Sequence, residues 1–376
     1  MIFSINQDVL LDTLNVIQRG LPVKTPLPIL NGIKLEVFED RLIFTTSNTD
    51  IAIQTVIEDE SLEVTAPGRV VIPGKYLIDI VRKISSNKIE MNLIENKILV
   101  IKADRSEFKL HVMDVEDYPD VDFLDSVKPL NLDSKTLKAI IKETNYATSV
   151  YEKRPILTGV NFKHEDEKLY CVATDSYRLS QKIVELSSEV EPFNIVIPNR
   201  SLDELSRILD SVNETVDIFI NPNKVLFKFR NIMYQTRLLD GVYPDTLRII
   251  PTEFPIVIKF NKEELLKSVE RVSLLSPRDK ENNYNIIKLN VRPDYIVEIS
   301  STNNEIGDAL EEIIPTGDVV GPMIKIAFSS KYLTEALKAF TSTEITLNFA
   351  GEIKPFVLKG ELDPDMLHLI LPVRIE

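Results

Sequence analysis

Three short stretches of this sequence share one pattern: Ile72–Leu77 reads Ile-Pro-Gly-Lys-Tyr-Leu, Ile197–Leu202 reads Ile-Pro-Asn-Arg-Ser-Leu, and Phe328–Leu333 reads Phe-Ser-Ser-Lys-Tyr-Leu. They begin 125 and then 131 residues apart. Tyr118–Asp120, which reads Tyr-Pro-Asp, also returns 125 residues later, at Tyr243–Asp245. Such a long period excludes a solenoid of short repeats. It predicts three copies of one domain, at residues 1–126, 127–253 and 254–376.

The order of patterns within each copy is also repeated. In the first copy, an alternating stretch at 2–5 leads to Leu10, Leu14 and Ile17, whose spacings of three and four are typical of an amphipathic helix. Stretches rich in Ile, Val, Phe and Thr follow and predict strands. A second helix and a hairpin complete the copy. The sequence therefore predicts an α+β fold, with two helices packed on antiparallel sheets in each domain.

Composition excludes several classes of protein. The single cysteine, Cys171, leaves no disulfide framework and no paired cysteines for zinc. No run of about 18 apolar residues could span a membrane, and no signal peptide is apparent. We therefore expect a soluble, cytoplasmic protein without a membrane partner.

The net charge of -14, from 44 basic and 58 acidic residues, argues at first against a partner made of phosphates. Charge split by element changes this interpretation. The six predicted helices together carry +3, which leaves -17 for strands and loops. Lys75, Arg200 and Lys331 occupy the same position in the three copies. Basic residues are common on any solvated helix, but a cation repeated at one position favours contact with phosphates. The predicted helices are 7–19, 74–84, 133–145, 199–209, 261–271 and 330–340.

No catalytic signature is present. Glycine-rich phosphate loops, nucleophile elbows and HExxH motifs are all absent. His164 is expected in a solvated hairpin turn, whereas His111 and His368 are expected within strands. Asp114, Glu116, Asp117 and Asp120 could in principle hold magnesium in a nuclease. The second copy keeps Asp240 and Asp245 but has Gly241 and Val242 where Glu116 and Asp117 would align, which favours a turn with proline at a fixed position. We therefore expect no enzyme, cofactor or metal.

The sequence resembles one family along its whole length, the bacterial sliding clamps, which are the beta subunits of DNA polymerase III. The resemblance depends on the threefold repeat, on Pro26–Leu30 and Ala173–Leu179, on Asp240–Asp245, and on the ending Ile370–Arg374. It implies a homodimer whose subunits join head to tail into a ring of six domains. Helices would line the hole, and DNA would be held by encirclement as a processivity factor requires.

The resemblance also implies two sets of contacts with partners. Double-stranded DNA, bound without sequence preference, would contact Lys24, Lys75, Lys153, Arg154, Arg200 and Arg207. Lys138, Lys142, Lys267, Arg271, Lys331 and Lys338 are further hypotheses from the helix pattern. A groove would bind peptides from the replicative polymerase, the clamp loader and repair proteins, and such a groove suits an aliphatic or aromatic anchor. Its residues would be Leu157, Thr174, Ser176, Tyr177, Arg178, Leu179, Pro244, Arg248, Ile249, Leu369, Ile370, Leu371, Pro372, Val373 and Arg374.

The subunit interface would pair Phe108 and Leu110 of one chain with Leu274 and Leu275 of the other. Alternation along a strand leaves Phe108 and Leu110 on one face. Two other functions stay open at this point: a peptide-binding scaffold that never encircles DNA, and the carboxylate nuclease.

Overall fold

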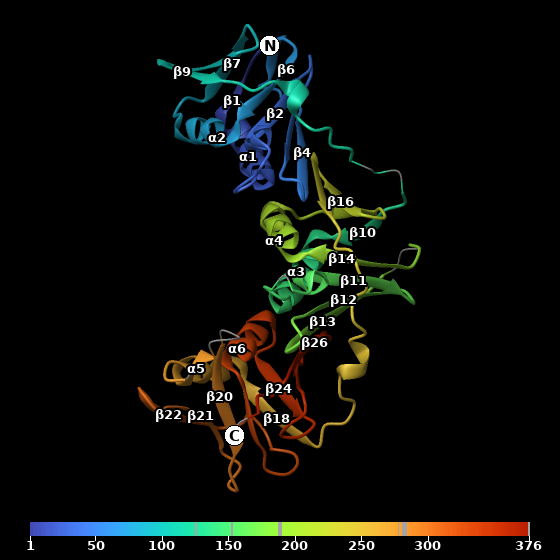
Figure 1. The fold of residues 1–376 in the computed structure, drawn as a ribbon, viewed down its shortest axis with the longest axis vertical. Helices are drawn as coiled ribbons and strands as arrows, with labels where there is room; N and C mark the ends of the chain where they lie inside the picture. The colour runs from blue at the N-terminus through green and yellow to red at the C-terminus, as the bar shows by residue number, and fades with distance from the viewer. Residues whose placement is uncertain are drawn as a thin grey trace. The chain divides into compact units, whose positions relative to one another are not determined.

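The structure is a computed structural model that describes residues 1–374, apart from 124, 126, 152, 187–189, 277 and 280–283. Its contacts divide the chain into two compact units. Unit 1 contains Met1–Leu137 and Arg200–Leu238, and unit 2 contains Lys138–Asn199 and Leu239–Glu376. All three boundaries between these segments fall inside the central repeat, so each unit joins one outer repeat to part of the central one. Figure 1 shows the elements of both.

Unit 1 contains two antiparallel sheets. The five-stranded sheet has the order β5 (Glu63–Ala66), β1 (Ile2–Asn6), β7 (Lys88–Ile94), β8 (Ile98–Ala103) and β9 (Ser106–His111). The eight-stranded sheet has the order β10 (Leu130–Asp133), β15 (Thr215–Ile220), β16 (Lys224–Phe229), β17 (Ile232–Arg237), β4 (Ile51–Ile57), β3 (Leu42–Ser47), β2 (Gly32–Val37) and β6 (Gly68–Pro73). In the larger sheet β17 of the central repeat pairs with β4 of the first repeat, with Tyr234 opposite Ile53.

Unit 2 repeats this arrangement. Its eight-stranded sheet has the order β14 (Phe193–Pro198), β11 (Gly159–Glu165), β12 (Lys168–Thr174), β13 (Arg178–Glu185), β26 (Asp363–Ile370), β25 (Phe356–Gly360), β24 (Glu344–Phe349) and β18 (Ile256–Asn261). Here β13 of the central repeat pairs with β26 of the last repeat, with Leu179 opposite Leu369.

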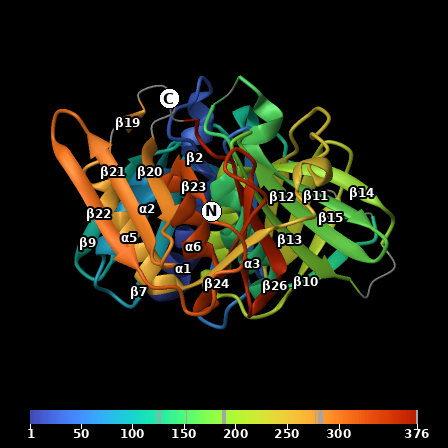
Figure 2. The same ribbon diagram turned by 90° about the horizontal axis from the view of Figure 1, so that it is seen from below.

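The second sheet of unit 2 has the order β19 (Arg278–Asp279), β20 (Tyr284–Val291), β21 (Val297–Asn303) and β22 (Gly307–Ile313), and β23 (Lys325–Ser329) pairs with β20. Figure 2 shows β20, β21 and β22 side by side.

The six helices of the described chain each follow directly on a strand: α1 (Gln7–Ile17), α2 (Gly74–Lys83), α3 (Ser134–Thr144), α4 (Asn199–Ile208), α5 (Lys262–Ser273) and α6 (Ser330–Ala339). Their apolar spacing buries one face, as in α1, where Leu10, Leu14 and Ile17 are fully buried. The Asn261 side chain accepts hydrogen bonds from the first-turn N–H groups of Glu263 and Glu264 and so caps α5. The predicted α+β class and helix positions are confirmed.

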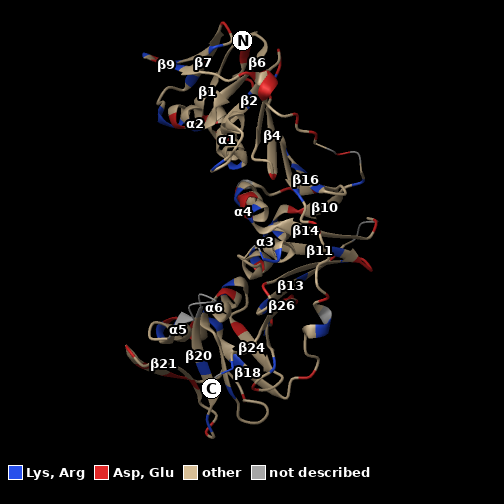
Figure 3. Ribbon diagram, in the orientation of Figure 1, with Lys and Arg blue, Asp and Glu red and all other residues tan. Residues whose placement is uncertain are grey.

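The helices as observed carry a formal net charge of +3, as the sequence indicates, so -17 belongs to the rest of the chain. Figure 3 marks the charged residues on the ribbon. Within the described residues, no helix is both long enough and apolar enough to cross a membrane.

One sequence expectation about a histidine is wrong. His164 does not lie in a solvated turn, because the turn falls at Asp166 and Glu167 and His164 is the sixth residue of β11. His164 is only 6% exposed, and the centroid of its ring lies 5.6 Å from the ring centroid of Phe193. The acidic neighbours of His164 gave the segment a polar appearance, although alternation along the strand turns the ring inward. His368 is buried in β26, whereas His111, in β9, is exposed.

Gly321 and Gly317 allow a test of whether the backbone at Gly321 requires glycine. Gly321 has a φ of +99°, and a Cβ there would lie 2.0 Å from the Pro255 carbonyl oxygen. At Gly317 a Cβ would meet nothing within 4 Å. We expect Gly321→Ala to lower the free energy of unfolding by about 1 to 3 kcal/mol or more, and Gly317→Ala to change it little. Urea denaturation of both variants measures the difference, and equal stability would contradict the strain at Gly321.

Candidate functional site

The loop between β12 and β13 is a tight turn held by its own side chains. Thr174 Oγ1 accepts a hydrogen bond from Ser176 N (3.1 Å), and Asp175 Oδ1 accepts from Tyr177 N (2.9 Å) and Arg178 N (3.0 Å). Ser176 has a φ of 79°, a conformation that non-glycine residues adopt rarely. The turn leaves the Tyr177 side chain 45% exposed. The sequence signal Ala-Thr-Asp-Ser-Tyr-Arg-Leu thus encodes a rigid turn that presents a tyrosine.

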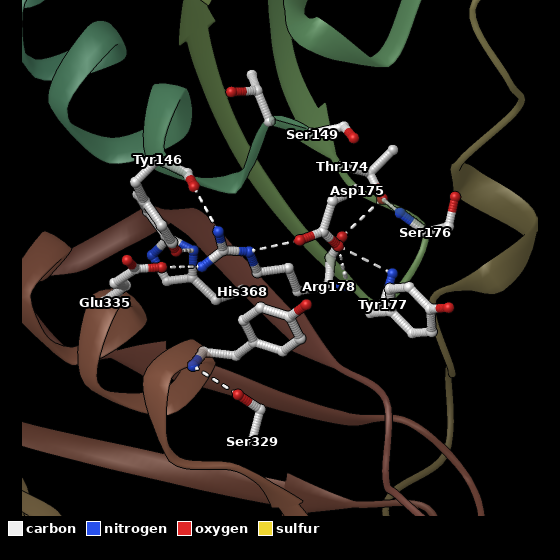
Figure 4. A network of polar contacts seen from close by, with 12 residues as sticks. Tyr146, Ser149, Thr174, Asp175, Ser176, Tyr177, Arg178, Ser329, Glu335 and His368 are labelled. Carbon is white, nitrogen blue, oxygen red and sulfur yellow. Dashed lines mark hydrogen bonds and ion pairs between the residues drawn. The ribbon is translucent and has the colours of Figure 1, made fainter. Parts of the chain in front are cut away.

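Arg178 points away from solvent into a network of polar contacts (Figure 4). Its Nε donates to Asp175 Oδ2 (3.1 Å), its Nη2 donates to the Tyr146 carbonyl oxygen (2.6 Å), and its Nη1 pairs with Glu335. The guanidinium carbon also lies 4.5 Å from the ring centroid of Tyr332. The residue is only 7% exposed. Arg178 therefore fixes the start of β13 to α6, and its charge is already compensated.

Burial shapes the ionisation of this network. Burial raises the pKa of Asp175, and the Arg178 guanidinium opposes that rise. Tyr146 Oη lies 2.6 Å from His368 Nδ1. Burial raises the pKa of Tyr146 and lowers that of His368 to about 3, so both are neutral at pH 7. None of these neutral groups has the exposure expected of a general acid or base that meets a substrate.

Two hydrogen bonds connect this turn to segments that carry other predicted groove residues. Tyr243 Oη accepts a hydrogen bond from Thr174 N (3.1 Å), which anchors the segment with Pro244, Arg248 and Ile249. Leu371 N donates to the Tyr177 carbonyl oxygen (2.9 Å), so the C-terminal stretch continues alongside the turn. Leu157, Leu179, Leu369 and Ile370 are buried beneath, whereas Tyr177, Pro244, Arg248, Ile249 and Arg374 are exposed and Leu371, Pro372 and Val373 are partly exposed. We call these groove residues, together with Thr174, Ser176 and Arg178, the candidate peptide surface.

Sequence reasoning missed the partners that hold Arg178. Glu335 lies 157 residues away in the sequence, and nothing in its helical context distinguishes it from a solvated glutamate. No sequence pattern predicts that Tyr146 and Tyr332 contact Arg178 either. Only the pairing of β13 with β26 brings these groups together.

The predicted DNA-contacting cations are all on the surface. Lys24 is exposed after α1, and Lys75 and Arg200 lie in the first turns of α2 and α4. Lys153 and Arg154 are exposed directly before the short 3-10 helix Pro155–Thr158. Among the described residues, none of these five forms an ion pair. Arg207 pairs with Glu204 at 3.3 Å.

Three of the further helix hypotheses concern cations whose charge is compensated. Lys267 pairs with Glu263, Arg271 with Glu311, and Lys338 with Glu270. Attraction of these three to phosphate would be weaker than that of an unpaired cation. Lys138, Lys142 and Lys331 lie on α3 and α6.

The residues predicted for the subunit interface lie at a sheet edge and at a helix end. Phe108 (36% exposed) and the partly exposed Leu110 lie on β9, the edge strand of its sheet. Leu274 is 78% exposed and follows α5 directly, with Leu275 partly exposed beside it.

The carboxylates near residue 114 have structural partners. Asp114 Oδ1 accepts a hydrogen bond from Glu116 N (3.0 Å), and Glu116 pairs with Arg69. In the part of the chain that the structure describes, no group of three or more His, Cys, Asp or Glu side chains could hold a metal ion. The nuclease alternative thus has no metal site among these residues.

Comparisons with known proteins agree with this geometry. Family models of the DNA polymerase III beta subunit match in order: its N-terminal domain at residues 1–122, its central domain at 131–245 and its C-terminal domain at 247–374. A beta sliding clamp of Staphylococcus epidermidis is 38% identical over 379 residues, which cover 100% of this chain and 99% of the relative. The chain belongs to the beta sliding clamp family.

Solved structures of sliding clamps have the same fold. The clamp of Bacillus subtilis matches with a TM-score of 0.95 and 36% identity, and the DNA polymerase III beta chain of Streptococcus pneumoniae matches with 0.95 and 37%. Each comparison covers 100% of both chains. The family and the fold predicted from the sequence are confirmed, and the function is that of a sliding clamp.

The Arg178 network generates a test of this clamp's stability. Removal of the guanidinium leaves Asp175 buried without its cation, so we expect Arg178→Ala to lower the free energy of unfolding by about 3 to 5 kcal/mol. Arg248→Ala is the control, because the pair that Arg248 forms with Asp245 is exposed and contributes at most about 1 kcal/mol. Urea denaturation measures both, and similar losses in the two variants would contradict the anchoring role of Arg178.

Proposed function

We propose that two copies of this chain close head to tail into a ring of six domains that encircles duplex DNA and tethers a DNA polymerase to it. The domains of each chain would be residues 1–126, 127–253 and 254–376. The observation that carries this proposal is the match of the whole chain to the sliding clamp family, because ring closure requires all three repeats. In this role the chain is a non-catalytic subunit of the polymerase holoenzyme and acts in the bacterial cytoplasm.

The distribution of charge supports encirclement rather than tight binding. A net +3 on the helices and -17 elsewhere places the net attraction for phosphates on the helices, and the exposed loop cations Lys24, Lys153 and Arg154 would add to it. A few cations that have no ion-pair partner among the described residues would contact the backbone of any DNA sequence weakly, and weak phosphate contacts allow a protein to slide. The candidates are Lys24, Lys75, Lys153, Arg154 and Arg200, with Arg207 partly compensated.

Exposed apolar residues at two places support ring closure. An unpaired edge strand such as β9 is a template for pairing with another chain, and Phe108 and Leu110 give it apolar side chains. Leu274 and Leu275 would meet them from the partner. Burial of such a patch would remove a large exposed leucine, 78% accessible in the single chain, from water.

The candidate peptide surface supports the tethering role. It combines an exposed tyrosine, apolar side chains and two exposed arginines, Arg248 and Arg374, around a turn that is rigid before any ligand binds. Preorganisation of this kind reduces the entropy that binding must overcome. We propose that it takes short linear segments of the replicative polymerase, the clamp loader and repair proteins.

Topology provides the decisive test of encirclement. Clamp placed on nicked circular DNA by a clamp loader should stay bound through gel filtration and should leave once the DNA is cut to a linear form. Leu274→Asp puts a charge into the proposed interface, so this variant should sediment as a monomer and be lost from circles as well. Equal retention on circular and linear DNA would favour a scaffold, and metal-dependent DNA cleavage lost in Asp120→Ala would favour a nuclease.

The peptide surface has its own test. Deletion of residues 371–376 leaves β26 intact but removes one side of the surface, so we expect polymerase stimulation to fall at least tenfold while the dimer persists in sedimentation. Tyr177→Ala should also reduce stimulation. Ile353→Ala removes another exposed apolar side chain, 74% accessible, elsewhere in unit 2 and should have no effect. Full stimulation by the deletion variant would contradict the assignment.

A further inference from the structure

Unit 1 contains a cavity of about 200 Å³ that the proposed function does not use. Leu27 and Leu30 line one side, the turn before β4 and the first residues of that strand line another (49–52), and the end of β17 with Gln235 closes it. Pro119, Asp120 and Val121 complete the lining. The cavity thus lies where the first and central repeats share a sheet.

The cavity is built from the same backbone parts as the candidate peptide surface. Asn48 Oδ1 accepts hydrogen bonds from Asp50 N (3.1 Å) and Ile51 N (2.8 Å), as Asp175 Oδ1 accepts from the two residues at the corresponding positions of its own turn. Thr49 has a φ of 80°, and Ser176 has 79°. These contacts align the two turns at an interval of 127 residues.

The strands that flank the two turns also correspond. Arg237 N donates to the Asp50 carbonyl oxygen (2.9 Å), just as Leu371 N donates to the Tyr177 carbonyl oxygen (2.9 Å). Leu30 at the cavity and Leu157 beneath the peptide surface are each the last residue of a Pro-Ile-Leu sequence. The cavity is therefore the counterpart, in the preceding repeat, of the candidate peptide surface.

One buried polar atom in the cavity lining has no partner. Gln235 is 4% exposed, and its Oε1 has no hydrogen-bond partner among the described residues. Native structures seldom leave such an acceptor unsatisfied. Thr49, also in the lining, is a β-branched residue in a strained conformation, and strain of this kind gathers at ligand-binding positions. A ligand that donates an N–H group to Gln235 would satisfy the acceptor.

The lining defines the chemistry of that ligand. Asp50, Asp120, Lys224 and Arg237 contribute two negative and two positive charges, and among the described residues none of them forms an ion pair. A balanced rim does not select a polyanion such as DNA. Leu27, which is 49% exposed, provides an apolar contact. The volume lies below the roughly 300 Å³ at which pockets for whole small molecules begin, so it suits one or two side chains of a longer chain.

We propose that this cavity is a second docking site for an extended peptide segment of a partner protein. The segment would insert an aliphatic or aromatic side chain against Leu27 and Leu30 and donate an N–H group to Gln235 Oε1. The choice of a peptide rests on the proposed function of the corresponding surface in unit 2. The cavity itself and the unsatisfied acceptor do not depend on that function.

Methyl NMR of the full-length protein with labelled isoleucine tests the two sites separately. Ile51 reports on the cavity and Ile249 on the candidate peptide surface. The probe is the acetylated tetrapeptide amide Ser-Leu-Phe-Ser, and its control has serine at all four positions. We expect the apolar peptide to shift both resonances saturably and the serine peptide to shift neither. An Ile51 signal that responds to both peptides alike, or to neither, overturns the inference.

Substitutions make the assignment to the cavity specific. Leu27→Glu should abolish the Ile51 response and leave that of Ile249, whereas Val23→Glu, at a fully exposed valine outside the lining, should leave both. Gln235→Leu keeps the apolar contact but removes the acceptor and should weaken binding at Ile51 about tenfold. Unchanged binding in whichever of Leu27→Glu and Gln235→Leu retains the fold overturns the inference.

The outcomes also separate this inference from the proposed function. A response at Ile249 that persists while Ile51 is silent contradicts the second site and leaves the first. A response at Ile51 alone supports the cavity and contradicts the peptide role of the unit 2 surface. Deletion of residues 371–376 should remove the Ile249 response only.

Discussion

The pairing of strands from neighbouring repeats is the constraint on which the rest of this structure depends. β4 pairs with β17 in unit 1, and β13 pairs with β26 in unit 2, so each eight-stranded sheet runs without interruption from one repeat into the next. A sheet edge left open would expose a row of unpaired N–H and C=O groups. Pairing satisfies those groups and divides the central repeat between the two units. It also creates, at the end of each shared pair, the turn that carries a candidate binding site.

The two turns show how one backbone supports different chemistry. Asn48 and Asp175 make the same pair of backbone contacts, and the residue three positions further on is Ile51 in one turn and Arg178 in the other. Ile51 lines a cavity. Arg178 instead donates all its side-chain hydrogen bonds in the structure to Asp175, Glu335 and the Tyr146 carbonyl oxygen. A buried arginine needs several acceptors to offset its desolvation. The turn in unit 2 is therefore anchored to α6, and its exposed residues are held in place.

The positions of the charged residues in this clamp, rather than its net charge, determine how it can contact DNA. The helices carry a small positive charge in a strongly acidic chain, and several of their cations, such as Lys267 and Lys338, are already paired with glutamates. A protein that encircles DNA needs little affinity for it, because topology prevents escape. Strong phosphate contacts would slow sliding, and their loss with salt would be steep. The few cations that form no ion pair within the described part of the chain are consistent with weak contact.

The sequence by itself determined the threefold repeat, the positions of the six helices, the net charge of those helices and the family, because each of these follows from local spacing and residue type. Tertiary structure decided the rest. The interval of 125 residues that relates Ile72 to Ile197 and Tyr118 to Tyr243 does not hold at the turns. There the backbone hydrogen bonds align Asn48 with Asp175, 127 residues away. The sequence also did not predict the burial of His164, the partners of Arg178 or the cavity beside Gln235. Each depends on which strands pair and in which register, and backbone hydrogen bonds between distant segments leave no mark in the local pattern of side chains.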